Sequence, residues 1–490
     1  MARSSVIEVA VIGGGASGLA AAKCLLEEGL RPTVFERSAH LGGVWCFDEG
    51  LPDGGSPAYR SLHTNTPKQA TAFSDFPFRA GLADYPACGE VVNYLSTYAD
   101  HFRVREHIRF ETRVDRVAPA GDGRWIVHTT SPAGRRAATF DAVFVCSGMF
   151  DEPVLPEYPG LAGFSGTLLH SRSYTDAAAF AGRRVLVVGT GSSGVDIALE
   201  TSQVARQVWL SARNDAWTRA TPAAPPRSGA WHARLARHLR LRLGLGSRRP
   251  PGYAAPPDAP FVMQPDFPIL SDRLREAIRA GAVLPRPGIV RVDGNTVSFA
   301  DGTSAEVDVI VCATGYVLRF PFLDEAIFRV PPAGLGLYRA VLHPDRPTLV
   351  FIGMSRASGP IMPLAEMQAR WAARVLRGAI ALPPPAAMHA QITARRNWIA
   401  ARGGNPFRIE FEPYMDLLAS EIGALPPLGR HPRLWRALLA GPPIAARYRF
   451  AGPARAANAP DILRSGNRLP PQPRAAPAPP VRDRRSWSRG

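Results

Sequence analysis

The sequence predicts an α/β protein built from two Rossmann-like domains, the second inserted into the first. Two strand–turn–helix units share one glycine spacing, the first at the N-terminus and the second near Val185. Mixed strands and turns separate these units, and an apolar strand at 307–313 follows the second one. This order is typical of one nucleotide-binding domain interrupted by another.

The first unit places three glycines between an apolar strand and a helix rich in Ala and Leu. Gly13 permits the tight turn, Gly15 lets the backbone approach a pyrophosphate, and Gly18 lets helix and strand pack closely. Ala16 and Ser17 open the helix, whose first N–H groups face the phosphates. The spacing therefore predicts a dinucleotide-binding turn.

An acidic residue completes this first site. Glu36 ends the next predicted strand, 23 residues after Gly13, where a carboxylate accepts hydrogen bonds from ribose hydroxyls. Strand, glycine turn, helix and acid all stand in register, which favours a functional site over a chance turn.

The second unit repeats the glycine frame with Gly189, Gly191 and Gly194, and Ser192 and Ser193 open its helix. The same context of strand before and helix after predicts a second dinucleotide-binding turn.

The second site lacks the acid of the first. Counting 23 residues from Gly189 leads to Ala212, which Ser211 and Arg213 flank. An arginine there can pair with a 2′-phosphate that a carboxylate would repel. We therefore expect this site to bind NADPH in preference to NADH.

Two dinucleotide sites in one chain imply hydride transfer from a nicotinamide to a flavin, here FAD. A disulfide reductase would need a redox-active cysteine pair, but the five cysteines form no CxxC pair and no metal-ligand spacing. We expect reduced, mostly buried thiols and no bound metal. The cysteines are Cys24, Cys46, Cys88, Cys146 and Cys312.

The composition is typical of a soluble globular protein, with 490 residues of which 46% are hydrophobic and 20% charged. No apolar run approaches the roughly 20 residues that span a bilayer, and the N-terminus leads directly into a strand without a signal peptide. We therefore expect a cytoplasmic protein without an integral membrane segment, and a homodimer is left open. The net charge of +17 comes from an arginine-rich composition without a nucleic-acid-binding motif, so no nucleic-acid partner is expected.

Two segments fall outside the domain pattern. Residues 220–260 are rich in Pro, Gly and Arg and enclose a basic helix with an apolar stripe at four-residue spacing. We expect this helix to pack on the second domain, with a membrane-surface or lid element as the alternative. Residues 451–490, dominated by Pro, Ala and Arg, are expected to be disordered. The apolar stripe consists of Trp231, Leu235, Leu239 and Leu243.

The stretch FSGTLLHSRSY resembles the fingerprint of the class B flavin-dependent monooxygenases, specifically the flavin-containing monooxygenase branch. That fingerprint is FxGxxxHxxx followed by Tyr or Phe, and its fixed positions here are Phe164, Gly166, His170 and Tyr174. The resemblance covers residues 6–385 in family order. Further similar stretches are ERSAHLGGVW from Glu36, YRSLHTNTPKQATAFSDFPF from Tyr59, VDVIVCATGY from Val307, LVFIGM from Leu349 and AEMQARW from Ala365.

The resemblance implies an FAD domain made of residues 1–165 and 311–450, with an NADPH domain of residues 166–310 inserted into it. The basic segment near 220–260 then belongs to the NADPH domain, and the tail 451–490 follows the FAD domain.

The resemblance also implies site residues on the FAD side. Gly42, Gly43, Val44 and Trp45 look like part of the FAD-binding loop, at the end of the matching stretch ERSAHLGGVW that Glu36 and Arg37 begin.

A second group of implied residues lies nearer the reacting atoms and the linker. Thr64 and Asn65 form a TN pair whose asparagine lies beside the flavin C4a and the nicotinamide. Thr314 and Gly315 lie in the linker between the nucleotide domains, and His170 is implied to respond to NADPH there rather than to act as a catalytic base.

The activity implied by the resemblance is monooxygenation. NADPH reduces FAD, molecular oxygen adds to give a C4a-hydroperoxyflavin, and Asn65 with bound NADP⁺ protects it until a nitrogen- or sulfur-containing small molecule takes one oxygen atom. Baeyer–Villiger oxidation, N-hydroxylation and a non-oxygenating NADPH/FAD redox sensor or oxidase stay open as alternatives. Tyr174 followed by Thr175 argues against the Baeyer–Villiger branch, whose fingerprint ends in Trp followed by Pro or Asp.

Overall fold

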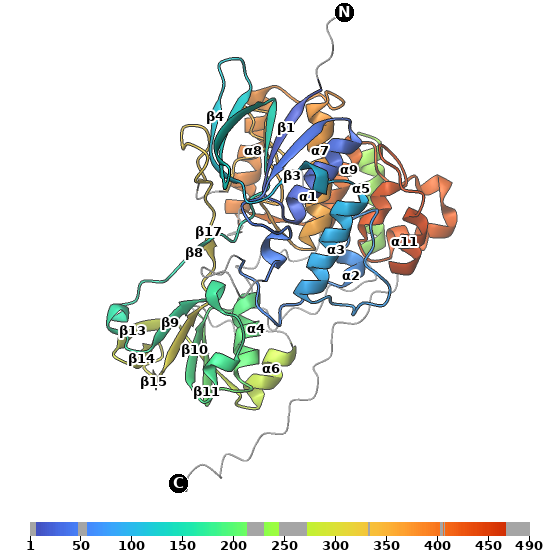
Figure 1. The fold of residues 1–490 in the computed structure, drawn as a ribbon. Coiled ribbons are helices and arrows are strands. Elements are labelled where there is room, and N and C mark those ends of the chain that lie inside the picture. The colour runs from blue at the N-terminus through green and yellow to red at the C-terminus, as the bar shows by residue number, and fades with distance from the viewer. Residues whose placement is uncertain are drawn as a thin grey trace, which may run out of the picture. The chain divides into compact units, whose positions relative to one another are not determined.

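The computed structural model describes residues 6–47, 56–212, 230–244, 272–331, 334–401, 405 and 407–466. The chain forms two compact units (Figure 1). Unit 1 holds the described residues up to Asp151, the segment 230–244 and the described residues from Leu318 onward. Unit 2 holds residues 152–212 and 272–317.

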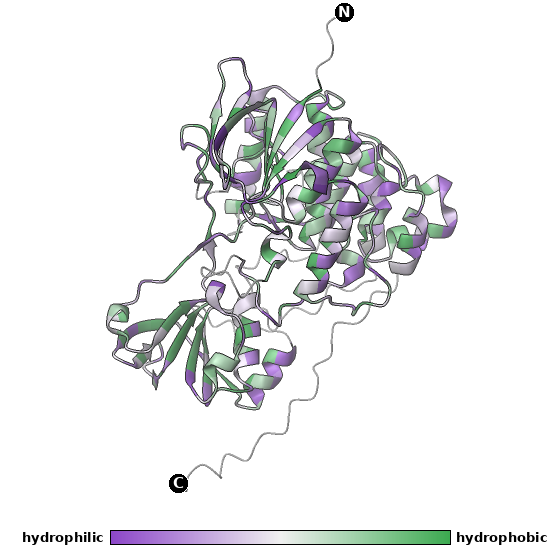
Figure 2. Ribbon diagram, in the orientation of Figure 1, coloured by the Kyte–Doolittle hydropathy of each residue, from purple (hydrophilic) through white to green (hydrophobic). Residues whose placement is uncertain are grey.

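Unit 1 is built on a parallel sheet. Its strands are β1 (Glu8–Ile12), β2 (Arg31–Phe35), β3 (Ile108–Arg109), β7 (Ala142–Val145) and β18 (Leu349–Phe351). They lie in the order β18-β7-β1-β2-β3. The strands are short. They are also largely apolar, as the colouring in Figure 2 shows, because layers cover both faces of the sheet.

Different layers cover the two faces of this sheet. Val9 and Val11 of β1 face a helical layer, whereas Ala10 and Ile12 face an antiparallel sheet, as the period of two along a strand requires. The antiparallel strands are β4 (Arg113–Pro119), β5 (Trp125–Ser131) and β6 (Gly134–Phe140). The longer helices are α1 (Ala16–Glu27), α3 (Cys88–His101), α7 (Ile361–Leu376), α8 (Pro385–Ala400) and α9 (Phe411–Glu421).

Further elements belong to unit 1. They include α5 (Ala230–Arg242), the shorter helices α2 (Lys68–Thr71), α10 (Trp435–Leu439) and α11 (Ala459–Gly466), the 3-10 helices η1 (Gly43–Trp45) and η8 (Ala445–Arg449), and the paired strands β19 (Arg356–Ala357) and β20 (Arg408–Ile409).

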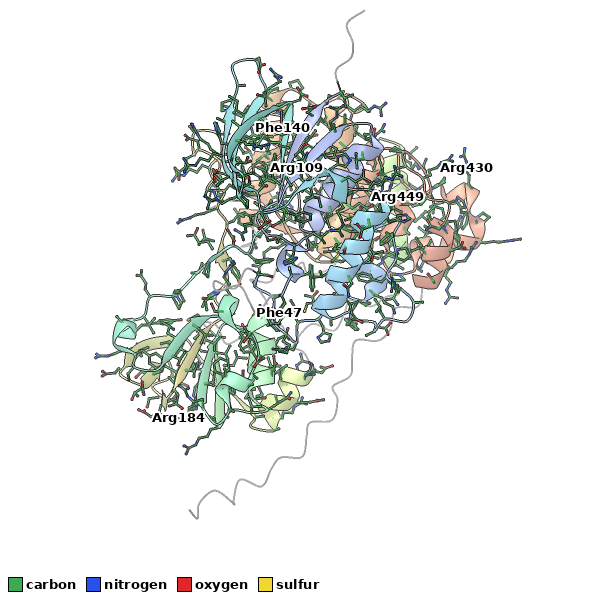
Figure 3. All side chains as sticks on the ribbon, in the orientation of Figure 1. Phe47, Arg109, Phe140, Arg184, Arg430 and Arg449 are labelled. Atoms are coloured by element: carbon green, nitrogen blue, oxygen red, sulfur yellow. The ribbon has the colours of Figure 1, made fainter. Side chains whose placement is uncertain are left out.

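Unit 2 contains a second parallel sheet. Its strands are β9 (Thr167–His170), β10 (Arg184–Val188), β11 (Gln207–Ser211), β12 (Val283–Arg286) and β16 (Val309–Cys312). They lie in the order β12-β11-β10-β16-β9. At the start of β10, Arg184 Nη2 lies 2.7 Å from Asp308 Oδ1 (Figure 3) and ties this strand to the residue before β16.

Unit 2 also contains helices and small sheets. They include α4 (Ser192–Thr201), α6 (Asp272–Arg279), the antiparallel strands β13 (Ile289–Asp293), β14 (Thr296–Phe299) and β15 (Ser304–Glu306), and the pair β8 (Glu152–Pro153) with β17 (Tyr316–Val317).

The two units repeat one topology. In each, the strand before the glycine turn lies between the strand after the first helix, β2 or β11, and a later strand, β7 or β16. In the sequence, β2 or β11 is followed first by a further parallel strand, β3 or β12. A three-stranded antiparallel sheet comes next, and then the later strand β7 or β16. The prediction of two Rossmann-like domains is confirmed.

The chain passes from unit 1 to unit 2 after Asp151 and returns after Val317. These points differ from the predicted boundaries at 165/166 and 310/311. The first boundary moves because residues before 165 already pack in unit 2, where Val292 N donates to Pro159 O at 2.9 Å. The second boundary moves because β17 pairs with β8.

The basic helix is α5, and the prediction that it packs on the second domain is wrong, because it packs on α9 and α10 of unit 1. Arg234 and Arg237 bind Glu412 of α9 with N–O distances of 2.5 and 2.6 Å, and Arg237 also binds Asp416 at 2.6 Å. The spacing of the apolar residues alone predicts that they form the buried face of α5. Arginines form its contact with α9 instead, because α9 presents carboxylates there. The large apolar residues left exposed on this segment are Trp231, Leu239 and Leu243.

Part of the predicted disordered tail is folded. Residues 451–466 continue from η8 into α11, where the Leu463 side chain is 1% exposed. Residues 467–490 lie outside the described part of the chain, as do 213–229, which include Arg213.

Two buried arginines fasten this C-terminal segment. Arg449 Nη1 donates to Ala454 O at 2.8 Å, and Arg370 Nη2 donates to Pro453 O at 3.3 Å. Composition predicts disorder here because it counts arginine as a solvated residue, whereas these guanidinium groups are buried against carboxylates and backbone carbonyls.

All five cysteines are free thiols, and only Cys46 is more than marginally accessible. Burial raises the pKa of the Cys24 and Cys146 thiols strongly and that of Cys312 to about 11. None of the described helices combines the length and the apolar sequence that crossing a bilayer requires.

Candidate functional site

The first glycine turn connects β1 to α1. Gly13 has φ +105°, and a Cβ there would lie 2.7 Å from the Cys146 carbonyl oxygen. A Cβ on Gly18 would overlap the Gly13 carbonyl oxygen. Both positions therefore require glycine, because turn, helix and the end of β7 pack backbone to backbone.

The start of α1 is open to an anion. Gly15 is its N-cap and makes no side-chain hydrogen bond, and the first turn, which Ala16 and Ser17 begin, contains no acid. The first N–H groups of the helix thus receive no acceptor from a capping side chain, and no acid of their own turn opposes their partial positive charge. Ser17 Oγ lies against Gly353, which follows β18.

The predicted FAD-binding loop meets this turn. A Cβ on Gly15 would lie 3.3 Å from Gly43 Cα, and Gly42 N donates to Gly14 O at 3.2 Å. Gly43 has φ +56° and begins η1, in which Val44 is exposed and Trp45 is half-buried. The structure therefore brings the loop of residues 42–45 to the helix start.

Glu36 lies on the turn. Its Oε2 accepts a hydrogen bond from Gly14 N at 2.6 Å, and its Oε1 accepts two from Ser38 N and Oγ at 2.9 Å. The Arg37 guanidinium is instead held by Asp151 at 2.7 Å, in a pair that is half exposed. Of these two predicted residues, only Glu36 contacts the glycine turn through a described hydrogen bond.

Thr64 and Asn65 lie in the segment before α2. Thr64 N donates to Pro86 O at 2.9 Å, and its Oγ1 is buried without a hydrogen-bond partner among the described residues. An orphaned hydroxyl of this kind fits a polar ligand that completes the site. Asn65 is exposed, and it does not cap α2, whose N-cap is Pro67.

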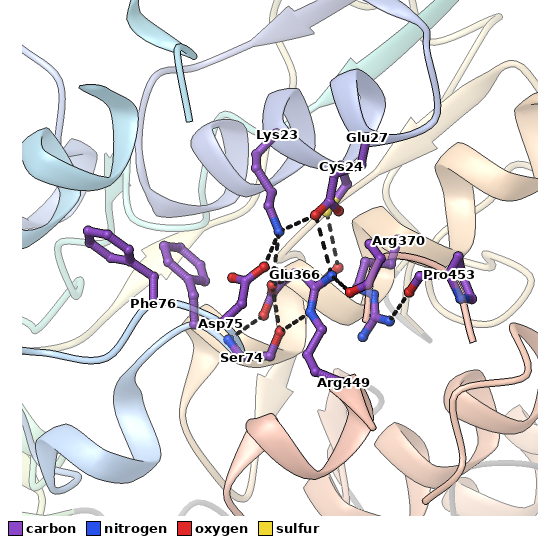
Figure 4. Close-up of polar contacts among 12 residues, drawn as sticks. Lys23, Cys24, Glu27, Ser74, Asp75, Phe76, Glu366, Arg370, Arg449 and Pro453 are labelled. Carbon is purple, nitrogen blue, oxygen red and sulfur yellow. Dashed lines mark hydrogen bonds and ion pairs between the residues drawn. The ribbon is translucent and has the colours of Figure 1, made fainter. Parts of the chain in front are cut away.

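The far end of α1 is anchored by a buried charge cluster (Figure 4). The cluster consists of Lys23, Glu27, Asp75, Glu366, Arg370 and Arg449. Lys23 Nζ lies 2.5 Å from Asp75 Oδ2, and Arg449 Nη2 lies 2.7 Å from Glu366 Oε1. Burial alone would raise the pKa of Glu366, but Arg449 and Lys23 lower it, so three cations balance three carboxylates. Glu366 and Arg370 of the AEMQARW stretch are therefore structural.

The second glycine turn connects β10 to α4. Gly189 has φ +110°, and a Cβ on Gly194 would overlap the Gly189 carbonyl oxygen. Gly191 caps α4 without a side-chain hydrogen bond, and a Cβ there would meet nothing within 4 Å. Ser192 is exposed and Ser193 half-buried in a first turn without an acid, so this helix start is also open to an anion.

The sheet register settles the position that corresponds to Glu36. Ile12 pairs with Phe35, and Val188 pairs with Ser211, so Ala212 follows β11 where Glu36 follows β2. The count from the glycines is confirmed. Ser211 Oγ is buried and donates to Pro287 O at 2.7 Å, so this hydroxyl is already engaged. Arg213 falls outside the described residues.

The predicted linker residues lie in unit 2. Thr314 Oγ1 donates to Val154 O, and the Gly315 carbonyl accepts from Val154 N at 3.0 Å and from His170 Nε2 at 3.1 Å. His170 Nδ1 accepts from Arg172 N at 3.1 Å, so the neutral tautomer with the proton on Nε2 satisfies both contacts. Burial lowers the pKa of His170. One ring nitrogen thus bonds the linker at Gly315, and the other accepts from the backbone of Arg172.

Sequence reasoning missed Gly148. It has φ +82° and follows β7 where Gly315, φ +88°, follows β16. The positions correspond because Val145 and Cys312 end equivalent strands beside β1 and β10. The shared pattern of apolar strand, two residues and glycine, VCSG and CATG, could have revealed it.

Comparison with known proteins gives a consistent result. The family model described as flavin-binding monooxygenase-like matches residues 6–244 and 259–469. The chain is 37% identical to flavin-containing monooxygenase 1 of Homo sapiens in an alignment 478 positions long, gaps included, which covers 91% of this chain and 90% of that protein. It is 36% identical to the N-oxide-forming dimethylaniline monooxygenase 2 of Mus musculus, over 91% of this chain and 89% of that protein.

Solved structures share the fold. The S-allyl-L-cysteine S-oxygenase from Allium sativum superposes with a TM-score of 0.67 at 30% identity, over 84% of this chain and 88% of that one. Cyclohexanone monooxygenase superposes with a TM-score of 0.57 over 84% of this chain and 97% of that one, but at 20% identity this likeness concerns the fold alone.

Proposed function

This chain belongs to the flavin-binding monooxygenase-like family, and it is an oxidoreductase as the relatives named above are. We propose that it transfers one oxygen atom to a nitrogen- or sulfur-containing small molecule. FAD and NADPH are its cofactors. One observation supports two different dinucleotides: two equivalent glycine turns lie in one chain, and among the described residues an acid meets the first turn but not the second.

We propose that the first turn holds FAD. The uncapped start of α1 would receive the pyrophosphate, Glu36 the ribose, and the loop of Gly43, Val44 and Trp45 the neighbouring part of the cofactor. The orphaned hydroxyl of Thr64 supports this assignment, because it is a buried donor and acceptor in the same unit.

We propose that the second turn holds NADPH. The start of α4 is open, Gly191 leaves space above it, and Ala212 presents no carboxylate to a 2′-phosphate. Arg213 follows Ala212 in the sequence and would supply the positive charge. Ser211 is a weaker candidate for this role than the sequence predicts, since its hydroxyl donates to Pro287 O.

Held at the first turn by Glu36 and the loop of residues 43–45, reduced FAD would supply the oxygen chemistry. Two electrons from NADPH and two protons reduce O₂, so that one oxygen atom goes to the substrate and the other leaves as water. The side chains of this chain bind, orient and exclude water. Asn65 is the exposed amide proposed to donate a hydrogen bond at the reacting edge without supplying a proton.

The names of relatives support soft nucleophiles as substrates. One relative is named for forming N-oxides of a dimethylaniline, and one solved neighbour is named for oxygenating the sulfur of S-allyl-L-cysteine. Both are similar to this chain at 30% identity or more, whereas the ketone monooxygenase is not.

Oxygenated product formed per NADPH consumed would test this proposal. A panel of tertiary amines, sulfides, primary amines and ketones should give N- or S-oxide with a ratio near one for the preferred class. A lactone or ester from the ketones would instead support Baeyer–Villiger chemistry. Hydrogen peroxide with every compound would support an oxidase or redox sensor.

Asn65→Ala separates its proposed role from a structural one. The variant should be reduced by NADPH at the wild-type rate but release more hydrogen peroxide and less product, because about 1 to 3 kcal/mol of hydrogen bonding is lost. Thr66→Val, next to it in the chain, is the matched control and should keep the wild-type product ratio. A flavin–oxygen intermediate as long-lived in Asn65→Ala as in the wild type, measured by stopped-flow spectra, would contradict the role.

A further inference from the structure

Arg286 ends β12 at the carboxyl edge of the unit 2 sheet. It pairs with Ser211 in the register of β11 and β12, and its carbonyl accepts a hydrogen bond from Ala212 N at 3.0 Å. Ala212 occupies the position that corresponds to Glu36, and dinucleotides bind outside the carboxyl ends of parallel strands. The strand next to this position therefore ends in an arginine, on the edge where the proposed NADPH site lies.

The Arg286 guanidinium is half-buried and has no carboxylate partner among the described residues. None of the salt bridges found there involves it, whereas Arg184 of the same sheet binds Asp308 at 2.7 Å. Its Nη1 donates to Pro285 O at 3.0 Å, and its Cζ lies 5.9 Å from the centre of the Phe299 ring. These contacts position the side chain without neutralising its charge. A half-buried cation without a counter-ion favours an anionic ligand.

Asp301 does not compensate this charge. A hydrogen bond from Thr303 is the main cause that lowers the pKa of Asp301, and the charge of Arg286 is a minor one. Asp301 Oδ1 accepts hydrogen bonds from Thr303 N and Oγ1 at 3.0 and 2.6 Å. The carboxylate is exposed, so water screens its attraction to Arg286. The Arg286 guanidinium thus keeps its charge available to a ligand.

The first unit carries an arginine at the same place, but with an acid beside it. Arg109 pairs with Phe35 at the end of β3, and Glu36 N donates to the Arg109 carbonyl at 2.9 Å. One carboxylate and one guanidinium thus belong to this edge of the first sheet. At the corresponding edge of the second sheet, Ala212 leaves Arg286 without the acid. The second edge therefore carries a positive charge that the first edge balances.

The ligand group that matches this charge is a phosphate on the adenosine ribose. The 2′-phosphate distinguishes NADPH from NADH and adds negative charge where Glu36 would repel it. A guanidinium group pairs with phosphate oxygens through two charge-assisted hydrogen bonds. Ser211, the predicted candidate at this edge, has its hydroxyl engaged by Pro287 O. Arg286 is thus a described residue at the edge whose charge and hydrogen-bond donors suit this phosphate.

We propose that Arg286 binds the 2′-phosphate of NADPH and contributes, together with Arg213, to the selection of NADPH over NADH. This inference rests on the NADPH site proposed at the second turn and names a further residue of that site. Counting from the glycines could not identify it, because Arg286 lies on another strand and meets Ala212 only through the pairing of β11 with β12.

Titration calorimetry of the FAD-loaded protein with two adenosine phosphates tests the assignment. One is 2′,5′-ADP, which carries the 2′-phosphate, and the other is 5′-AMP, which lacks it. Arg286→Met keeps a side chain of similar length against Phe299 but removes the charge. We expect this variant to bind 2′,5′-ADP about 10-fold or more weakly and 5′-AMP within about 2-fold of the wild type. Arg286→Lys, which keeps the charge, should retain more affinity for 2′,5′-ADP than Arg286→Met.

Arg206→Ala is the matched control. Arg206 is an exposed arginine that precedes β11 at the amino edge of the same sheet, so its removal changes the net charge of the unit equally. This variant should bind 2′,5′-ADP like the wild type. Thermal unfolding of each variant, measured alongside, establishes that it is folded.

Equal affinity of the wild type and Arg286→Met for 2′,5′-ADP would overturn the proposal. A loss of 5′-AMP affinity as large as the loss for 2′,5′-ADP would also overturn it, because Arg286 would then hold the fold or the adenosine rather than the 2′-phosphate. A wild type that binds neither 2′,5′-ADP nor NADP⁺ would refute the NADPH site itself, and this inference with it. The two failures are therefore distinguishable.

Discussion

The glycine turns after β1 and β10 share a backbone and differ in their surroundings. Gly13 and Gly189 have φ of +105° and +110°, and the third glycine of each turn packs on the carbonyl of the first. Glu36 accepts a hydrogen bond from the first turn, whereas Ala212 holds that place beside the second. The difference indicates that glycine spacing provides the anion site, while the residue after the second strand distinguishes the dinucleotides.

The units also differ in how their first helix is held. In unit 1 the buried charge cluster joins α1 to α7 and to η8, near the C-terminal end of the described chain. Helix α4 follows the second glycine turn as α1 follows the first, and none of the salt bridges found among the described residues involves α4. The anchoring of the first helix in unit 1 therefore depends on residues far along the chain.

The largest expected effect comes from substituting the glycines that the backbone of both turns requires. Gly18→Ala should cost about 3 kcal/mol or more and abolish FAD binding, because its Cβ would overlap the Gly13 carbonyl. Gly194→Ala should damage NADPH binding while FAD is retained. Gly191→Ala is the control for folding alone, since its Cβ would meet no protein atom within 4 Å, and it should keep the wild-type flavin content and stability. Flavin content and thermal unfolding would measure this, and wild-type flavin content in Gly18→Ala would contradict the comparison.

A pair of truncations sharpens the difference between the helix anchors. A chain ending at Gly452 loses the buried Leu463 and leaves Arg370 without the Pro453 carbonyl, so we expect it to lose about 2 to 5 kcal/mol and much of its flavin. A chain ending at Gly466 keeps these contacts and should retain flavin and turnover. Equal stability of the two chains in denaturant unfolding would show that the C-terminal segment does not hold unit 1.

Exchanging the distinguishing residue should alter cofactor preference. Ala212→Glu places in the second turn the acid that the first turn has, and Arg213→Ala removes the neighbouring charge. Each should reduce the preference for NADPH over NADH by roughly 10- to 100-fold, the equivalent of about 1.5 to 3 kcal/mol. Ratios of kcat/KM for the two nucleotides measure this. Equal use of both nucleotides by the wild type would refute the assignment of the second turn.

The smallest expected effect concerns pH and unit 2. Burial lowers the pKa of His170 below its ordinary value near 6.5, so its neutral form stabilises the fold above about pH 6.5, and this contribution is lost as pH falls. His170→Gln, which can still donate to Gly315 O, should lack this component. Between about pH 7.5 and about pH 5.5 the melting temperature should fall further in the wild type than in the variant, by under about 4 °C. Parallel curves would show that His170 does not titrate in this way.

The fold was predictable to the extent that it depends on local backbone requirements. Gly13, Gly18, Gly189 and Gly194 identified both turns because no side chain fits there, and the register confirms the count to Ala212. The place of Thr64, with its orphaned hydroxyl, is consistent with the resemblance, and the roles of Asn65 and Arg213 stay predictions.

The wrong predictions, on the packing of α5 and on disorder after residue 450, both concern segments that buried or half-buried arginines hold in place. Arg234 and Arg237 reversed the expected buried face of α5 because their partners, Glu412 and Asp416, lie about 180 residues away in the sequence. Arg449 likewise orders a segment whose composition predicts disorder. Spacing and composition carry no information about such distant charge partners, which only the packed structure brings together.

Burial protects cysteine thiols from oxidation, which matters in an enzyme that activates oxygen on its own cofactor. Oxidation of cysteine proceeds through the thiolate, and burial raises the pKa of Cys24 and Cys146 so that the thiolate is scarce. Of these two cysteines, Cys146 lies next to the first glycine turn, because its carbonyl packs against Gly13. The fold thus shields this thiol from self-inactivation by leaked peroxide, and half-buried Cys46, beside η1, is the first that such an oxidant would reach.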